Sequence, residues 1–368
     1  MKKVLFLAVV SLAAASCLKN EAFVVETPQE LTFKAVANVA TKADAQLEGT
    51  LLNEDYRIYA SATQKKADGT IENASYFTDK PFATADSPVI AASTYHAMEL
   101  VEDVWQVSPI YWPLGGCLVD YIAYAMPTAV HDANPAPENG PVATYANATT
   151  DVASHLAFNS WDTYKNQVDV LYAVKNGANT TANAGAYTLP LTFNHAQALL
   201  VFKAKVNIEH VMQINEIKIN GLLVKGDFVV DNTKNNLLVE WANLLAVPGE
   251  DVVAPGENPE DDNLHAFVPT EDPTADASEY LDNTGTDEWE QVGSSLLIPQ
   301  QPALNFVVTY TISGKTMKYE YNHNRSAWEM GKKYVYNLDF TLNEVVITES
   351  VEDFLAADNL VENTIPLK

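Results

Sequence analysis

The sequence predicts an all-β protein built from β-sandwiches. Apolar and polar residues alternate with a period of two in many short segments, as they do in strands with one buried face. Helical periodicity is confined to two short stretches, near residues 93–100 and 194–199. Strands that follow one another without intervening helices favour packed sheets over a parallel α/β arrangement. With 368 residues, 47% of them hydrophobic, the chain is long enough for two such domains.

The expected strands run from near the N-terminus almost to the C-terminus. In the first of them, at residues 31–39, apolar side chains occupy alternate positions: Leu31, Phe33, Ala35, Ala37 and Val39. Further strands in the first half of the chain are expected at residues 55–61, 119–125, 167–173 and 189–195. Those in the second half are expected at residues 199–206, 214–220, 226–230, 304–312, 318–321 and 333–342, with a hairpin turn at 313–314.

These strands suggest two tandem domains separated near Tyr187. We expect an N-terminal β-sandwich at residues 44–187 and a C-terminal β-sandwich at residues 188–346, followed by a tail at 347–368. Residues 131–166 are rich in Pro, Asn and Ala and are expected to form a long loop. Residues 249–292 form an acidic, proline-containing insertion, since no Lys or Arg occurs between Lys234 and Lys315.

The N-terminus has the features of an export signal. Two lysines precede an apolar run that is too short to span a bilayer as a helix, and small residues follow it up to Cys17. A Cys directly after the small residues indicates a lipoprotein signal at residues 1–16, with Cys17 lipidated and first in the mature chain. The alternative is a signal peptide that merely ends near a Cys. In the lipoprotein interpretation, the chain leaves the cytoplasm and is anchored to the outer membrane by lipid.

Composition and motifs exclude several functions. A formal net charge of −26 argues against nucleic acid as a partner, because phosphate binding requires a basic surface. The seven histidines lack zinc-site spacing, and no calcium-loop, phosphate-loop or hydrolase-elbow pattern occurs. His195 is expected to be a hydrogen-bonded packing residue, and Cys117 a buried structural cysteine. The sequence thus predicts neither an enzyme nor a cofactor or metal site.

Four stretches, in order along the mature chain, resemble the fimbrillins of Bacteroidia, in particular the Mfa-like branch that builds type V pili. The first is Tyr111-Trp112-Pro113 with residues 118–127, and the second is residues 167–173. The third is residues 191–203, which contain His195, and the fourth combines residues 298–300 with residues 328–336. The resemblance implies two transthyretin-like β-sandwiches. It also implies a surface lipoprotein precursor that assembles with other pilus subunits by donor-strand exchange.

In such a precursor, the first strand is a placeholder that a protease removes, and a strand of another subunit then replaces it. The resemblance implies that residues 31–39 are this placeholder strand. Because no Arg precedes Arg57, we expect a trypsin-like cut between Lys42 and Ala43. The C-terminal tail is the candidate donor strand, with Val361, Ile365 and Leu367 on one face; a frayed tail is the alternative.

Two further questions remain open at the level of sequence. A chain that is never cut at Lys42 would be an anchor or a monomeric surface lipoprotein. The sequence does not distinguish a stalk subunit from a tip or an anchor subunit. The alternative function is glycan binding by a non-polymerising lipoprotein, with Trp105, Tyr111 and Trp112 as an aromatic platform. A host protein or glycan would more plausibly be bound by the long loops at residues 131–166 and 249–291.

Overall fold

The computed structural model describes a large part of the chain. The described residues are 30–37, 52, 55–73, 96–102, 104–112, 117–128, 140–146, 155–163, 166–178, 187–206, 212–220, 222–232, 237–245, 264–267, 289–300, 304–312, 314–323, 327–340 and 345–354. Nearly all of their regular structure is β-strand. This confirms the all-β fold class that the alternating pattern predicts.

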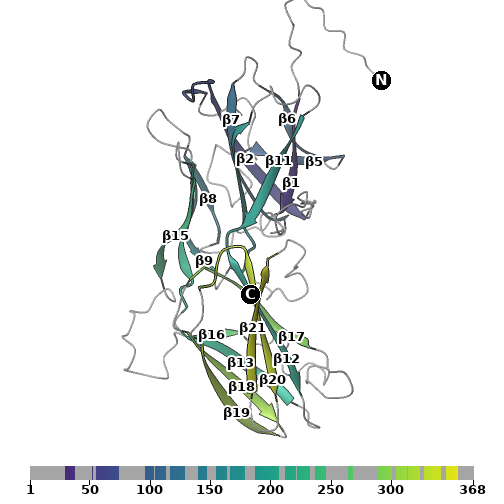
Figure 1. The fold of residues 1–368 in the computed structure, drawn as a ribbon, viewed down its shortest axis with the longest axis vertical. Coiled ribbons are helices and arrows are strands. Elements are labelled where there is room, and N and C mark those ends of the chain that lie inside the picture. The colour runs from purple at the N-terminus through teal and green to yellow at the C-terminus, as the bar shows by residue number, and fades with distance from the viewer. Residues whose placement is uncertain are drawn as a thin grey trace, which may run out of the picture.

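The molecule is elongated, with strands from the first half of the chain at one end and most of those from the second half at the other (Figure 1). The first group forms a nine-stranded sheet with the order β3-β2-β7-β10-β11-β1-β6-β5, and β4 pairs with β2. Its strands are β1 Glu30–Ala37, β2 Tyr56–Lys65, β3 Ile71–Asn73, β4 His96–Ala97, β5 Glu99–Val101, β6 Val104–Tyr111, β7 Leu118–Pro127, β10 Leu171–Ala178 and β11 Tyr187–His195.

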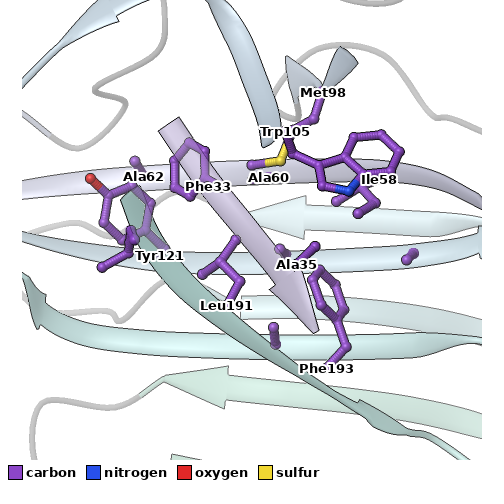
Figure 2. Close-up of a cluster of buried hydrophobic side chains, with 14 of the residues drawn as sticks. Phe33, Ala35, Ile58, Ala60, Ala62, Met98, Trp105, Tyr121, Leu191 and Phe193 are labelled. Carbon is purple, nitrogen blue, oxygen red and sulfur yellow. The ribbon is translucent and has the colours of Figure 1, made fainter. Parts of the chain in front are cut away.

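Strand β11 joins two parts of this sheet. Its residues from Tyr187 to Phe193 pair with β1, while its end pairs with β10 at Asn194 and His195. The two parts enclose a common core that contains residues of β1, β2, β6, β7, β10 and β11. Figure 2 shows β1 and β11 crossing over the strands that carry Ala60, Ala62 and Tyr121. The first core therefore lies directly beneath β1.

The second half of the chain contributes two four-stranded sheets, with the orders β17-β12-β20-β21 and β16-β13-β18-β19. Both supply side chains to one core, where aromatic rings of Phe202, Phe306, Trp328 and Tyr336 are in contact. The strands are β12 Ala198–Val206, β13 Met212–Asn220, β16 Leu264–Phe267, β17 Glu290–Leu297, β18 Leu304–Ile312, β19 Lys315–His323, β20 Lys332–Phe340 and β21 Val345–Asp353.

A third four-stranded sheet draws on both halves of the chain. Its order is β15-β14-β9-β8, where β8 is Ala143–Ala146, β9 His155–Asp162, β14 Lys225–Asn232 and β15 Leu237–Leu245. It covers the outer face of β7: Tyr121, Ala123 and Ala125 enter the first core, whereas Ile122, Tyr124 and Met126 enter a core shared with Phe158 and Phe228. Burial on both faces explains why the β7 sequence is apolar almost without interruption.

Several sequence expectations are corrected by these strands. The expected loop at 131–166 contains β8 and β9, and the helical pattern near 93–100 belongs to β4 and β5. The helical pattern near 194–199 spans the end of β11 and the start of β12. Within the acidic insertion at 249–292, β16 pairs with β13 and β17 begins at Glu290. Cys117 is half-buried, with Sγ 3.3 Å from Glu72 Oε2, rather than buried.

The expected limits of the C-terminal domain also move. Leu189, Leu191 and Phe193 of β11 pack in the first core, so the chain passes from the first core to the second after His195 and not at residue 187. The limit at 346 falls inside β21, which pairs with β20 from Val345 to Asp353, and Phe354 beyond it is buried. The candidate tail therefore begins after Phe354.

Candidate functional site: the slot that β1 occupies

Strand β1 lies inside its sheet, not at the edge. On one side it pairs in parallel with β11 over seven residue pairs, from Leu31↔Tyr187 to Ala37↔Phe193. On the other side it pairs antiparallel with β6, through Glu30↔Tyr111, Thr32↔Gln106 and Phe33↔Trp105. We call the space that β1 fills between β6 and β11 the β1 slot. An N-terminal segment thus supplies a central strand that no later part of the described chain supplies.

The alternating pattern of β1 places its apolar side chains in the first core. Leu31, Phe33 and Ala35 are at most 1% exposed, whereas Lys34 on the opposite face is exposed. The Phe33 ring meets the Tyr121 ring edge to face, with centroids 5.5 Å apart. Burial of a large apolar side chain is worth about 1.5–3 kcal/mol. Leu31 and Phe33 therefore contribute a substantial part of a stability that is usually about 5–15 kcal/mol.

Polar contacts fix the register of β1. The hydroxyl oxygens of Thr32 and Thr188 are 2.9 Å apart across the β1–β11 pair. At the far end, the Leu52 backbone N–H donates to the Ala35 carbonyl at 3.1 Å, and the Leu52 carbonyl accepts from Trp105 Nε1 at 3.1 Å. Leu52 is itself buried in the first core. The chain therefore returns to the side of β1 after residues 38–51, the interval that contains the expected cut.

Loss of β1 would leave β6 and β11 each without a neighbour on the side that β1 occupies, while β6 still pairs with β5 and β11 with β10. Adjacent strands lie about 4.8 Å apart, so β6 and β11 would be left about 9.6 Å apart, a separation that accommodates one strand between them. The unpaired backbone groups of β6 and β11, next to the apolar first core, would form a template for strand addition. The arrangement can bind an extended peptide by main-chain hydrogen bonds and by alternate side chains.

The structure brings together only some of the sequence-predicted site residues. Leu31, Phe33 and Ala35 line up in β1 as expected, and Ala37 pairs with Phe193 at the end of the strand. The remaining predicted residues lie outside the described part of the chain: Cys17, Val39, Lys42, Ala43, Val361, Ile365 and Leu367. Lipidation, cleavage and strand donation at these positions stay predictions.

The aromatic platform expected for a glycan does not form on the surface. Trp105 is 3% exposed and Trp112 is 2% exposed, and both belong to the first core. The Trp112 ring lies edge to face with Tyr121, with centroids 6.4 Å apart, so it packs directly behind β1. A sugar cannot stack on rings that the core covers. The glycan alternative therefore loses the observation that suggested it.

Other family-like residues hold the two halves of the chain together. His195 Nδ1 lies 2.8 Å from Asp169 Oδ1, and the His195 ring stacks on Phe354 with centroids 3.6 Å apart. Both His195 and Phe354 are buried, so the residue that follows β21 packs against the end of β11. Burial and, to a smaller extent, the negative charge of Asp169 raise the pKa of nearby Tyr56. His195 is thus a hydrogen-bonded packing residue, as the sequence predicts.

Two glutamine side chains extend this junction. The Gln167 amide oxygen accepts from the Leu296 backbone N–H at 2.7 Å, which ties the segment before β10 to β17. The Gln300 side chain accepts from the Leu223 N–H and donates to the Leu223 carbonyl, each at 2.9 Å. Gln300 also forms a β-bridge with Trp328. The Gln and Trp of the family-like motifs therefore serve packing and not chemistry.

Breaking the junction at one buried polar pair should be measurable. Asp169→Ala would leave the buried His195 Nδ1 without its acceptor, and we expect the free energy of unfolding to fall by about 1–3 kcal/mol. Asp169→Asn is the control, since its amide oxygen can still accept from Nδ1. Urea denaturation of the mature chain measures both variants. Equal stability of the Ala variant and the native chain would contradict the structural role of the pair.

The described residues contain no group of three or more His, Cys, Asp or Glu side chains that could hold a metal ion. Within the same residues, no helix is long and apolar enough to cross a membrane.

The fold and the β1 slot together define a class: an all-β protein whose N-terminal strand completes the sheet over its first core. Residues 41–353 match the family model described as fimbrillin-like, and the chain therefore belongs to the fimbrillin-like family. This family comprises fimbrial proteins and not enzymes, in agreement with the sequence prediction. The match begins at residue 41 and so leaves β1 outside it.

The chain is similar to several solved structures of fimbrial proteins. A fimbrial protein from Bacteroides vulgatus aligns with a TM-score of 0.50 at 12% identity, over 88% of this chain and 99% of that chain. The tip fimbrial protein Mfa3 from Porphyromonas gingivalis, with a C-terminal truncation, aligns with a TM-score of 0.37 at 10% identity, over 89% and 100%. A fimbrial assembly protein from Parabacteroides distasonis gives 0.35 at 11% identity, over 89% and 95%. No curated protein matches the chain.

Proposed function

We propose that this chain is the precursor of a subunit of a cell-surface type V pilus, and that β1 is its placeholder strand. Membership of the fimbrillin-like family supports a pilus subunit or adhesin at the cell surface. The observation that carries the finer proposal is the position of β1 between β6 and β11, with Leu31, Phe33 and Ala35 buried in the first core. A central strand located at the very start of the described chain can be removed by a single cut.

The proposed sequence of events follows from this position. Lipid on Cys17 holds the exported precursor at the outer membrane. A cut between Lys42 and Ala43 then separates the segment that contains β1 from the rest of the chain. Leu52, which lies in the first core beside β1, stays with the cut chain. A strand of another pilus subunit replaces β1 and restores the buried side chains and the hydrogen bonds of β6 and β11.

Limited trypsin digestion of the folded mature chain tests this proposal. We expect one early cut, with a new N-terminus at Ala43, because a peptide bond inside a paired strand such as that of Arg57 in β2 is protected. After the cut, the β1 fragment should be exchangeable for an added strand. Resistance of Lys42 to trypsin, or a cut chain that never releases β1, would favour an uncut anchor or a solitary surface lipoprotein.

A further inference from the structure

We infer that the strand which replaces β1 in this chain comes from a different polypeptide and not from the tail of a second copy. The inference rests on the proposed function, because it specifies the partner of the same slot. The slot requires a proline-free segment with three apolar side chains at alternate positions: two large and one small. This chain carries such a segment in β1 and lacks one in its own C-terminal tail.

The requirement for three apolar side chains comes from burial. Leu31, Phe33 and Ala35 are 1%, 0% and 0% exposed. A polar side chain in any of these three positions would be taken out of water among apolar neighbours, which strongly disfavours it unless it finds a partner. The third position is filled by a methyl group, so a much larger side chain there would overpack the core.

The tail does not supply this pattern in either of its two alternate series. From Leu355 onward, one series reads Leu, Ala, Asn, Val, Asn, Ile and Leu, and the other reads Ala, Asp, Leu, Glu, Thr, Pro and Lys. Neither contains three consecutive apolar residues of suitable size without proline. Every register that takes all three side chains from residues 355–368 therefore buries at least one polar residue.

Two registers place Ile365 and Leu367 in the two large positions, one for each strand direction. In the direction of β1, Ile365 replaces Leu31 and Leu367 replaces Phe33. In the opposite direction, Leu367 replaces Leu31, Ile365 replaces Phe33, and Asn363 falls at Ala35. A shift by two residues puts Leu367 or Ile365 in the place of Ala35.

Both of these registers also place Pro366 where Thr32 lies. Thr32 pairs with Thr188 on one side and with Gln106 on the other, and its hydroxyl contacts that of Thr188 at 2.9 Å. Proline has no backbone N–H, so in a strand with neighbours on both sides it removes a ladder hydrogen bond. Side-chain fit and backbone pairing therefore disfavour the same tail. The tail remains available to a partner with a differently shaped slot.

A strand-exchange experiment tests the inference on the intact fold. The mature chain is folded first and then cut after Lys42, or at a protease sequence engineered into residues 40–45, so that the β1 fragment remains bound in the slot. Three peptides are added in equal excess. They are residues 28–39, residues 355–368, and residues 355–368 with Asn363→Ala and Pro366→Thr. Native mass spectrometry measures how much of the β1 fragment each peptide displaces.

We expect residues 28–39 and the doubly substituted tail to enter the slot, and the native tail to compete at least about tenfold less well. A native tail that competes as well as residues 28–39 would overturn the inference while leaving the proposed function intact. If the doubly substituted tail did not displace the β1 fragment, Asn363 and Pro366 would not be the reason why the native tail competes poorly. Failure of residues 28–39 themselves to exchange would overturn the proposed function as well.

Discussion

Replacing Phe33 by alanine should lower the free energy of unfolding of the uncut mature chain by about 3–5 kcal/mol. Phe33 is fully buried between Tyr121 and the rest of the first core, and the β1 slot closes over it from both sides. Truncation leaves a cavity that a sheet paired on both sides cannot easily close. Urea denaturation, followed by tryptophan fluorescence, measures the change because Trp105 and Trp112 lie in the same core.

Lys34→Ala is the matched control for Phe33→Ala. Lys34 is the next residue of the same strand and is exposed, so its truncation should change the stability by no more than about 0.5 kcal/mol. Similar effects of the two substitutions would show that the burial of β1 adds little to the free energy of unfolding. The proposed role of β1 as a placeholder would then have no energetic basis. After the cut at Lys42, Phe33→Ala should also speed the loss of the β1 fragment, since fewer contacts hold it.

A disulfide between β1 and β11 should abolish strand exchange completely. Thr32 and Thr188 are register partners with hydroxyl oxygens 2.9 Å apart, so cysteines at both positions are close enough to bond. In a chain that also carries Cys17→Ser and Cys117→Ser, the only remaining cysteines are the introduced pair. After the cut at Lys42, the oxidised protein should retain its β1 fragment and stay monomeric whatever strand is added.

Reduction provides the control within the same sample. A reducing agent breaks the Thr32→Cys/Thr188→Cys bond and should restore release of β1 and entry of an added strand. The single variant Thr188→Cys should exchange normally under both conditions. If the oxidised double variant accepted a foreign strand as readily as the reduced one, strand addition would be occurring somewhere other than the β1 slot.

The sequence alone could predict the strands that alternate regularly. Strand β1 shows its buried residues at Leu31, Phe33 and Ala35, two positions apart, and β7 is identified by its apolar run. The sequence pattern does not show which strands pair with each other. The parallel pairing of β1 with β11 joins residues more than 150 positions apart, and only the folded sheet shows that β1 is central and not at an edge.

Strand β9 shows why an alternating pattern can be missed. Leu156 and Phe158 are buried two residues apart, but the next buried aromatic is Trp161, three residues further on. Ser160 between them has a φ of 53°, and its backbone N–H donates to Asp227 Oδ1 at 2.6 Å. This bulge interrupts the period of two, so the sequence of β9, between Pro- and Asn-rich segments, has the pattern of a loop.

The path of β11 explains where the boundary lies, and burial decides between the two roles, core packing and sugar binding, that the sequence allows for Trp105 and Trp112. A new run of strands begins at residue 187 and suggests a boundary there, yet β11 completes the first core before the chain reaches the second. Trp105 and Trp112 resemble a binding platform in sequence because aromatic rings serve both cores and sugars. Only their burial under β1 distinguishes the two roles.

We predict that β1 is absent from the assembled form of this protein. N-terminal sequencing of the chain recovered from purified surface pili tests it most directly. We predict a start after Ala37, at or close to Ala43, with no peptide from β1 present in stoichiometric amount. A chain that still begins at Cys17 and retains β1 within the assembled pilus would show that β1 is not a placeholder strand.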